Sequence, residues 1–195
     1  RPAECSSRMQ LTEQVSCNWT IKLMQFRTGV HGVGKTYLGS PAAASLKLPY
    51  ATASSLIRAE LGAANWNEQK RVQDSYRNQE ALISAVSKMR KSDRRLVLDG
   101  HFVLRDAVGK LAPLSVDVFR CLGIKGAILL EAPADVVFRR LAERAAPQSL
   151  ESIEELALAE LQHSAQVCRE LEIPLVQLHA PDEHQLRSAI QALMA

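Results

Sequence analysis

A short glycine-rich segment near the amino end constrains the fold and function of this chain more than any other feature. Residues 29–36 read Gly-Val-His-Gly-Val-Gly-Lys-Thr, which matches the pattern G-x-x-x-x-G-K-[ST] of a phosphate-binding loop. Glycines let such a loop wrap around an anion, so that successive backbone N–H groups point inward. The sequence therefore predicts a nucleotide-binding loop made of Gly29, Val30, His31, Gly32, Val33, Gly34, Lys35 and Thr36.

Two side chains at the end of this loop carry its charge and metal chemistry. Lys35 supplies a mobile ammonium for the β- and γ-phosphates of a nucleotide, and the Thr36 hydroxyl is a ligand for Mg²⁺. A helix that begins at this point adds roughly half a positive charge at its N-terminus. We therefore expect the cofactors to be ATP and Mg²⁺, with Lys35 both binding the donor and acting in catalysis.

The rest of the chain alternates between expected strands and helices. Residues 22–28 and 37–47 flank the loop as strand and helix, which is the setting the motif requires. The apolar run at 126–131 is typical of a strand in a parallel sheet whose two faces are covered by helices. Further strands are expected at 48–51, 95–100 and 174–179, and helices at 53–61, 67–91, 115–121, 133–145, 150–171 and 182–194, with a loop after residue 100.

This pattern predicts the fold class and the domain organisation. We expect an α/β protein with the three-layer P-loop NTPase fold, in which a parallel sheet of about five strands carries helices on both faces. The 195 residues suffice for one domain, and 47% of them are hydrophobic, as in ordinary globular proteins. Residues 1–23 lack a clear periodicity, so we expect them to be an extension outside a core domain of residues 24–195.

Charge, cysteines and hydrophobicity limit the partners and the compartment. The net charge of +3 is too small to indicate nucleic-acid binding. The four cysteines show no C-x-x-C pair, and Cys121 and Cys168 are expected to be buried thiols. No apolar run approaches the length that spans a membrane, and no secretory signal is evident. We therefore expect a cytoplasmic protein without a membrane partner.

A second candidate site residue lies far from the loop in the sequence. Asp99 ends the expected strand at 95–100, and in a parallel α/β sheet the ligand lies at the carboxyl ends of the strands. A carboxylate there is suited to hold the Mg²⁺ shell, directly or through water. Asp99 is therefore expected to be a metal ligand and a catalytic residue, with a helix cap or an Asp-Gly turn as the alternative interpretation.

Four segments in series resemble a known family. They are the loop at 29–36, Thr-Ala-Ser-Ser-Leu-Ile-Arg at 52–58, Leu-Asp-Gly at 98–100 and Pro-Ala-Asp-Val-Val-Phe-Arg-Arg-Leu-Ala-Glu-Arg at 133–144. In this order and spacing, from about Met24 to the C-terminus, the chain is similar to nucleoside monophosphate kinases, above all adenylate kinases and the small P-loop kinases near them. Only the loop is specific by itself.

The resemblance implies roles for three arginines. Arg58 would hold the phosphate of the acceptor, while Arg140 and Arg144 would lie against the donor base and the transferring phosphates. Arg140 and Arg144 are four residues apart and so share one face of a helix. Arginine suits this work because its planar fork contacts phosphate oxygens in pairs and stays charged. We expect Arg140 to bind ATP and both residues to act in catalysis.

Several positions depart from the family pattern. His31 stands where the family usually has Pro, and we expect it to shape the loop. Arg105 lies further along than the arginine of the family's Asp-Gly-Phe-Pro-Arg run, and His101 follows the metal acid. Both are candidates for binding the acceptor, with a packed imidazole as the alternative for His101. Ala53 and Ser54 replace the usual Thr and Gly near the acceptor, so AMP is not singled out.

These observations favour an adenylate kinase-like phosphotransferase that passes the γ-phosphate of ATP to a small acceptor, expected to be a nucleoside monophosphate. Two alternatives stay open. One is an ATP-binding regulatory NTPase module that controls a partner protein, and the other is a kinase of a non-nucleotide metabolite or of a nucleic-acid end. The expected partners are small-molecule nucleotides, and a protein partner is compatible with the sequence but not identified by it.

Overall fold

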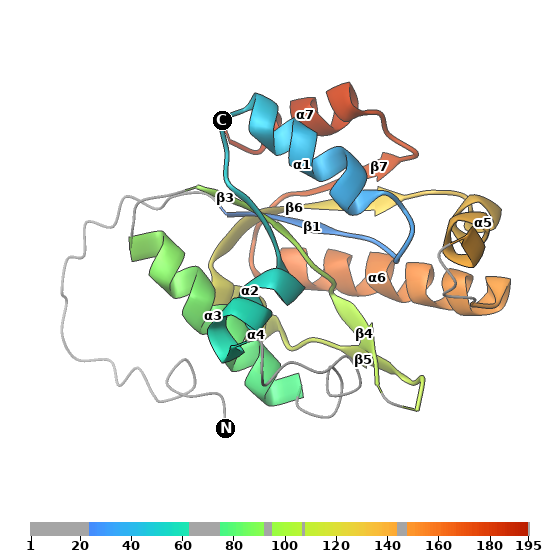
Figure 1. Cartoon of the computed structure of the whole chain (residues 1–195), viewed down its shortest axis with the longest axis horizontal. Coiled ribbons are helices and arrows are strands. Elements are labelled where there is room, and N and C mark those ends of the chain that lie inside the picture. The colour runs from blue at the N-terminus through green and yellow to red at the C-terminus, as the bar shows by residue number, and fades with distance from the viewer. Residues whose placement is uncertain (1–23, 63–74, 92–94, 107, 144–147, 195) are drawn as a thin grey trace.

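A five-stranded parallel sheet forms the middle layer of the protein (Figure 1). The computed structural model describes residues 24–62, 75–91, 95–106, 108–143 and 148–194. The strand order across the sheet is β2-β3-β1-β6-β7. The strands are β1 Met24–Thr28, β2 Tyr50–Thr52, β3 Leu96–Asp99, β6 Ile124–Glu131 and β7 Leu175–His179. The predicted α/β fold with a parallel sheet of about five strands is confirmed.

The register of the strands brings three strand ends to one place. β1 pairs with β3 in parallel, with Arg27 opposite Asp99, and β2 pairs with β3, with Thr52 opposite Asp99. The three strands therefore end at the same edge of the sheet. The phosphate-binding loop leaves β1 at this edge and α2 follows β2 there. In open α/β sheets this is the edge at which ligands bind.

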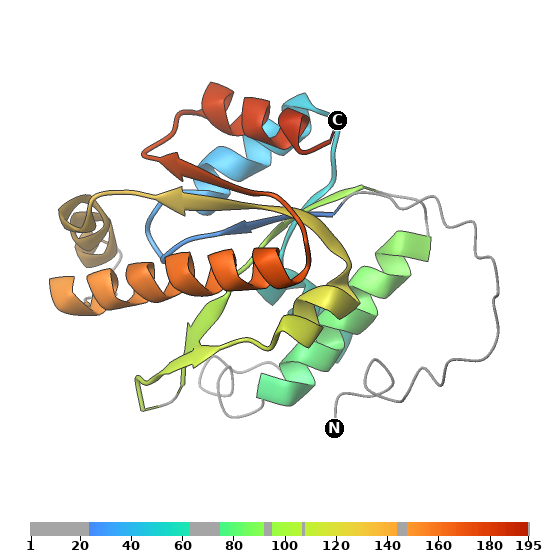
Figure 2. The same cartoon turned by 180° about the vertical axis from the view of Figure 1, so that it is seen from behind.

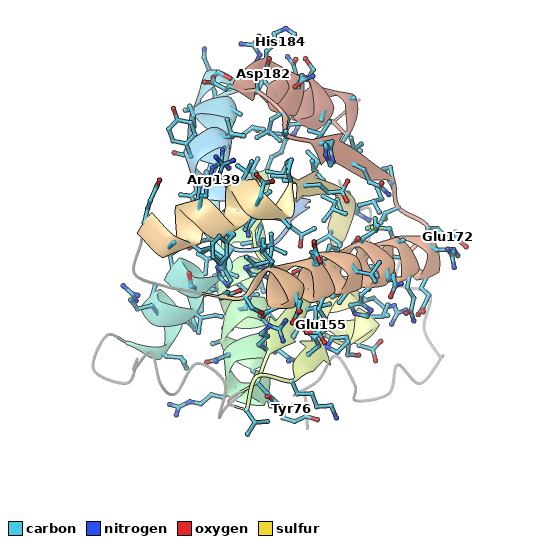
Figure 3. All side chains as sticks on the ribbon, turned by 90° about the vertical axis from the view of Figure 1, so that its right-hand side faces the viewer. Tyr76, Arg139, Glu155, Glu172, Asp182 and His184 are labelled. Atoms are coloured by element: carbon cyan, nitrogen blue, oxygen red, sulfur yellow. The ribbon has the colours of Figure 1, made fainter. Side chains whose placement is uncertain are left out.

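Helices cover both faces of the sheet and complete three layers (Figures 1 and 2). α1 and α7 pack together on one face, while α6, α3 and α4 lie on the other. The helices are α1 Lys35–Ser45, α2 Ala53–Leu61, α3 Ser75–Lys91, α4 Val116–Leu122, α5 Ala134–Glu143, α6 Leu150–Glu170 and α7 Glu183–Ala192. Charged side chains such as Arg139 on α5 and Glu155 on α6 lie on the outside (Figure 3).

The core packs between the sheet and these helices. All of β3 and most of β6 are buried, because both faces of the parallel sheet are covered. On one side the rings of Phe102 and Phe119 stack, with their centroids 4.4 Å apart. On the other side α7 buries Leu186 and Ile190 against the core. The two helical layers therefore each contribute large apolar side chains, as the three-layer fold requires.

The segment between β3 and α4 differs from the expected loop. It contains an antiparallel hairpin of β4 Val103–Arg105 and β5 Leu111–Pro113. Each strand has only three residues, which is too short for an alternation of apolar and polar residues to be recognised. The hairpin lies against α6 and forms part of the site described below.

Two predictions on domain and element bounds concern residues outside the described ranges. The extension at 1–23 lies entirely outside them. The expected helix at 67–91 is described only from Ser75, where α3 begins. Its first part therefore stays a prediction.

The two cysteines expected to be thiols differ from each other. Cys168 is a buried free thiol, and burial raises its pKa to about 11. Cys121 lies half-buried at the end of α4 and is disulfide-bonded, so the prediction of a buried thiol is wrong at this position. Among the described helices, none is both long and apolar enough to cross a membrane.

Replacing Leu186 with Ala should lower the free energy of unfolding by about 2–5 kcal/mol, because truncation leaves a cavity between α7 and the sheet. The Leu186 side chain is fully buried. Urea unfolding followed by circular dichroism measures this loss. Ser188→Ala, on the exposed side of the same helix, is the control and should change stability by less than about 0.5 kcal/mol. Equal losses in the two variants would contradict this packing of α7.

Candidate active site

The glycines of the phosphate-binding loop hold backbone conformations that other residues rarely adopt. Gly29, Gly32 and Gly34 have φ angles of 134°, 83° and 103°. A Cβ atom on Gly29 would lie 2.3 Å from the carbonyl oxygen of Leu130 on β6. Glycine is therefore required for the start of the loop to pass this close to the neighbouring strand.

The loop has one side in the core and another toward a pocket. Val30 and Val33 are buried among the core residues and anchor the loop from behind. The loop residues that line the pocket are His31, Gly32, Gly34, Lys35 and Thr36. The predicted loop is therefore formed, with its polar and glycine positions facing the space where a ligand would bind.

The ammonium group of Lys35 lies over the loop. The residue is only 8% exposed, and Nζ donates hydrogen bonds to the carbonyl oxygens of Gly29 at 2.6 Å and Val30 at 3.2 Å. These carbonyls offer dipoles rather than a full negative charge. Phosphate oxygens in the loop would give the buried ammonium a stronger partner.

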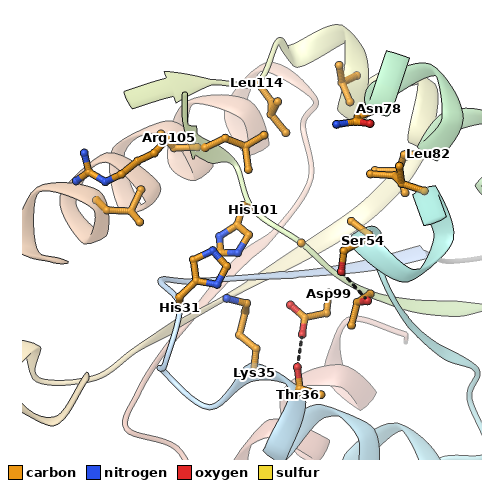
Figure 4. Close-up of a pocket in the computed structure, with 18 of the residues that line it drawn as sticks. His31, Lys35, Thr36, Ser54, Asn78, Leu82, Asp99, His101, Arg105 and Leu114 are labelled. Atoms are coloured by element: carbon orange, nitrogen blue, oxygen red, sulfur yellow. Dashed lines mark hydrogen bonds between the residues drawn. The ribbon is translucent and has the colours of Figure 1, made fainter. Parts of the chain in front are cut away.

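The structure brings Thr36 and Asp99 together. Thr36 Oγ1 donates a hydrogen bond to Asp99 Oδ2 at 3.3 Å, although the residues are 63 positions apart in the sequence (Figure 4). Asp99 is buried at the end of β3. A hydroxyl and a carboxylate are hard oxygen donors of the kind Mg²⁺ prefers, so the donor set fits the predicted metal ligands. The hydroxyl of Tyr50, which the sequence analysis did not identify, also donates to Asp99 Oδ2 at 2.7 Å.

A pocket of about 520 Å³ extends from the loop across the end of the sheet. At the loop end its walls carry Lys35, Thr36 and Asp99, the predicted donor and metal ligands. The rest of the wall combines polar residues at the start of α2 and on α3 with a larger apolar surface. This apolar surface includes Ile57, Leu82, Val103, Leu104, Leu114, Val118, Phe119, Leu122 and Leu156. The pocket therefore has a charged end and an apolar end.

His101 lies between these two ends, next to His31 (Figure 4). The two rings are 4.5 Å apart between centroids and inclined by 44°. Nδ1 of His101 lies 3.0 Å from Oε1 of Glu160, a fully buried residue of α6. His101 therefore lines the pocket and is also packed against a buried carboxylate, and its role in binding the acceptor stays a prediction.

The buried pair of His101 and Glu160 has perturbed protonation equilibria. Burial, and then the charge of Lys35, lowers the pKa of His101 below its ordinary value. Burial alone would raise the pKa of Glu160, but hydrogen bonds from His101, Thr28 and the Phe102 backbone outweigh it and lower the pKa. In this contact Nδ1 of His101 faces a carboxylate oxygen, which accepts hydrogen bonds when it is ionised.

The predicted arginines are placed differently from one another. Nη1 of Arg140 lies 3.3 Å from the carbonyl oxygens of both Gly32 and Val33, so α5 delivers this guanidinium to the phosphate-binding loop. Arg58 is exposed on α2 and is not among the described residues that line the pocket. Arg144 lies outside the described residues. The roles assigned to all three stay predictions.

Arg105 lines the pocket but is held by α6. Its Nη2 donates to the carbonyl oxygen of Ser152 and to Oε2 of Glu155, each at 2.8 Å, and its Nη1 donates to the carbonyl oxygen of Gly109 at 2.7 Å. The carboxylate of Glu155 neutralises the guanidinium. Binding of an acceptor phosphate by Arg105 would therefore require exchange of this ion pair.

The sequence contained a signal for only one of the two site residues that were missed. Glu160 falls at helical spacing among the buried residues Ile153, Leu156 and Val167 of α6, so it is a charge on an apolar helix face. Such a position indicates a buried carboxylate with polar partners. Tyr50 lies in a three-residue strand and offers no comparable pattern.

Comparison with protein families gives a match over most of the chain. The family model described as an AAA domain matches residues 28–157, which include the phosphate-binding loop, Asp99 and α5. A comparison with curated proteins gave no match.

Solved structures with the same fold include several kinases. A shikimate kinase from Acinetobacter baumannii in complex with shikimate is 16% identical, with a TM-score of 0.57, and the match covers 89% of this chain and 93% of that one. A shikimate kinase from Bacteroides thetaiotaomicron is 18% identical, with a TM-score of 0.55 and coverage of 88% and 95%. A sugar kinase from Janibacter sp. HTCC2649 is 16% identical, with a TM-score of 0.55 and coverage of 89% and 94%. At these identities the likeness concerns the fold alone.

Replacing Gly29 with Ala should weaken ATP binding at least tenfold and lower the unfolding midpoint, because its Cβ would collide with the Leu130 carbonyl. Calorimetric titration and thermal unfolding measure the two effects. Gly109→Ala is the matched control, since Gly109 also has a positive φ but no described atom within 4 Å of its Cβ position. It should cost only about 1–2 kcal/mol of stability. Normal ATP affinity in Gly29→Ala would contradict the loop geometry.

Replacing Lys35 with Met should raise the Kd for ATP by about 10- to 150-fold, which corresponds to roughly 1.5–3 kcal/mol for a hydrogen bond to a charged group. Methionine keeps most of the side-chain volume and removes the ammonium. Calorimetric titration with ATP measures the change, with Lys110→Met on the exposed hairpin as the control. An unchanged Kd in Lys35→Met would show that the ammonium does not bind phosphate.

Proposed function

The chain belongs to the AAA domain family, and we propose that it is an ATP-dependent phosphotransferase that passes the γ-phosphate of ATP to a small acceptor. The observation that carries this proposal is the contact between Thr36 and Asp99 beside the phosphate-binding loop. A carboxylate repels phosphate oxygens unless a cation lies between them. Its position at the mouth of the loop therefore supports a nucleotide bound together with Mg²⁺.

In this proposal different residues around the loop bind the metal and the phosphates. Thr36 and Asp99 hold the metal, which supplies neutralisation of charge on the phosphates when it is bound. Lys35 and the loop N–H groups orient the phosphates of the donor. Arg140 lies against the loop carbonyls and is placed to turn toward those phosphates. No nucleophilic side chain is required, since phosphoryl transfer depends on positioning and electrostatic stabilisation.

A nucleoside monophosphate is one candidate acceptor, as the resemblance to adenylate kinases implies. Its base would pack on the apolar wall formed by residues such as Leu82 and Phe119. Its phosphate would need a cation at the acceptor end. Arg105 is the guanidinium that lines this end of the described pocket, and it is paired with Glu155, while Arg58 lies on the exposed side of α2.

A hydroxyl-bearing metabolite is a second candidate. The apolar end of the pocket suits a carbon skeleton, and the guanidinium of Arg105 at this end is paired with Glu155. Shikimate kinases and a sugar kinase share the fold, and their names indicate that they phosphorylate small molecules with hydroxyl groups. This likeness in fold supports the class of reaction without identifying the acceptor.

The test is a transfer assay with Mg²⁺-ATP and a panel of acceptors. Nucleoside monophosphates form one arm, and hydroxyl compounds including shikimate and sugars form the other. We expect ADP to form together with one phosphorylated acceptor, detected by chromatography and mass spectrometry. Asp99→Asn should raise the Mg²⁺ concentration for half-maximal rate about tenfold, because a carboxylate ligand is lost.

Other outcomes of this assay have definite meanings. Tight ATP binding with slow hydrolysis and no phosphorylated product from either arm would contradict the phosphotransferase and favour a regulatory NTPase module. If the rate of Asp99→Asn depended on the Mg²⁺ concentration as that of the natural protein does, the metal role of Asp99 would be contradicted. Lys35→Met serves as the inactive reference in both measurements.

A further inference from the structure

The two side-chain hydrogen bonds that Asp99 accepts both go to the same oxygen. Oδ2 accepts from the hydroxyl of Tyr50 at 2.7 Å and from that of Thr36 at 3.3 Å. Within the described part of the chain, no hydrogen bond reaches Oδ1. In Figure 4 this second oxygen points away from Thr36, to the side on which Lys35 lies. Asp99 lines the pocket, so Oδ1 is the oxygen left for a ligand there.

Strand β2 brings Tyr50 to this carboxylate. In the parallel pairing of β2 with β3, Tyr50 lies opposite Val97 and Thr52 lies opposite Asp99. Residues two apart in a strand share a face of the sheet, so the long side chain of Tyr50 spans one step along that face to reach Asp99. The Tyr50 side chain also packs against the hydrophobic core. The position of its hydroxyl is therefore set by the strand register and by packing.

The carboxylate of an aspartate does not fix its own orientation. Its terminal torsion is broad, so hydrogen bonds decide which way the two oxygens point. The contact from Thr36 is the longer of the two, and the hydroxyl of Thr36 is itself assigned to the metal in the proposed function. Tyr50 is not among the described residues that line the pocket, so its hydroxyl contacts Asp99 from outside the space that a ligand would occupy.

We propose that Tyr50 is a positioning residue of the metal site, whose hydroxyl holds Oδ2 of Asp99 so that Oδ1 stays directed toward the divalent cation of a bound nucleotide. The proposal rests on the metal role given to Asp99 in the proposed function. Carboxylates that ligate metals are themselves hydrogen-bonded, and loss of such a partner costs roughly 10- to 100-fold in metal affinity. Tyr50 thus affects how strongly the cation is held without contacting it.

Nucleotide binding with and without Mg²⁺ tests this proposal and needs no assay of phosphoryl transfer. Calorimetric titration of the full chain with ADP gives one Kd in excess MgCl₂ and another in EDTA. The ratio of the Kd in EDTA to the Kd in MgCl₂ measures how much the cation strengthens binding. Tyr50→Phe should lower this ratio about tenfold and leave the Kd in EDTA within about twofold of that of the natural chain.

Two further variants control for the loss of a tyrosine and for folding. Phenylalanine keeps the ring that packs against the core, so Tyr50→Phe removes only the hydroxyl. Tyr76→Phe removes the same group from an exposed side chain of α3 and should leave the ratio unchanged. Tyr50→Leu also lacks the hydroxyl and should show the same fall as Tyr50→Phe, so the result does not depend on the folding of one variant.

A double variant shows whether Tyr50 acts through Asp99. Asp99→Ala removes the carboxylate and should lower the ratio at least as much as Tyr50→Phe does. Adding Tyr50→Phe to Asp99→Ala should then change the ratio by less than about twofold, because the effects of residues in contact are not additive when one acts through the other. A further fall of the full size in the double variant would overturn the proposal, since Tyr50 would then act by another route.

The remaining outcomes separate the role of Tyr50 from the proposed function. An unchanged ratio in Tyr50→Phe, or an equal loss of ADP affinity in EDTA and in MgCl₂, would overturn the positioning role and leave the phosphotransferase intact. If Mg²⁺ does not strengthen ADP binding by the natural chain, the metal role of Asp99 and the role of Tyr50 both fail. If the ratio falls as expected but no acceptor is phosphorylated, the phosphotransferase fails and the role of Tyr50 stands.

Discussion

The parallel pairing of β1 with β3 is the constraint on which the candidate site depends. Because Arg27 lies opposite Asp99, the phosphate-binding loop starts where the carboxylate of Asp99 emerges from the sheet. Groups 63 residues apart in sequence, Thr36 and Asp99, thereby reach hydrogen-bonding distance. The pairing of β1 with β6 has a second effect, since it places the Leu130 carbonyl where only a glycine at position 29 fits. Strand register therefore sets both the contact between Thr36 and Asp99 and the backbone of the loop.

Features with a local cause were predictable from the sequence. The loop at 29–36 needs particular residue types at fixed spacing, so its pattern can be recognised in a single sequence. The strand ending at Asp99 is a short buried run followed by a turn residue, and helices such as α6 repeat apolar residues at helical spacing. The three-layer fold follows from these elements, because a parallel sheet needs helices on both faces. The family match over residues 28–157 agrees with that fold.

Features that depend on distant contacts were not predictable in the same way. The hairpin of β4 and β5 has strands of three residues, and its pairing is stabilised by packing on α6 rather than by its own pattern. Tyr50 and Glu160 contact the site through partners 49 and 59 residues away. The hydrogen-bond partners of an arginine side chain also depend on residues far away in the sequence. Arg105 lies at the pocket as expected, yet its pairing with Glu155 changes what it is available to bind.

The buried charges around the pocket differ in how far their partners are supplied by the protein itself. Lys35, Asp99 and Glu160 are all buried, and buried charges are stabilised only when partners surround them. Lys35 and Asp99 line the pocket at the loop end, so in the proposed function their charges would be available to a nucleotide and its metal. Glu160 is satisfied entirely by donors of the protein, and it presents no charge to the pocket. Its contact with His101 fixes one side of that imidazole at the pocket wall.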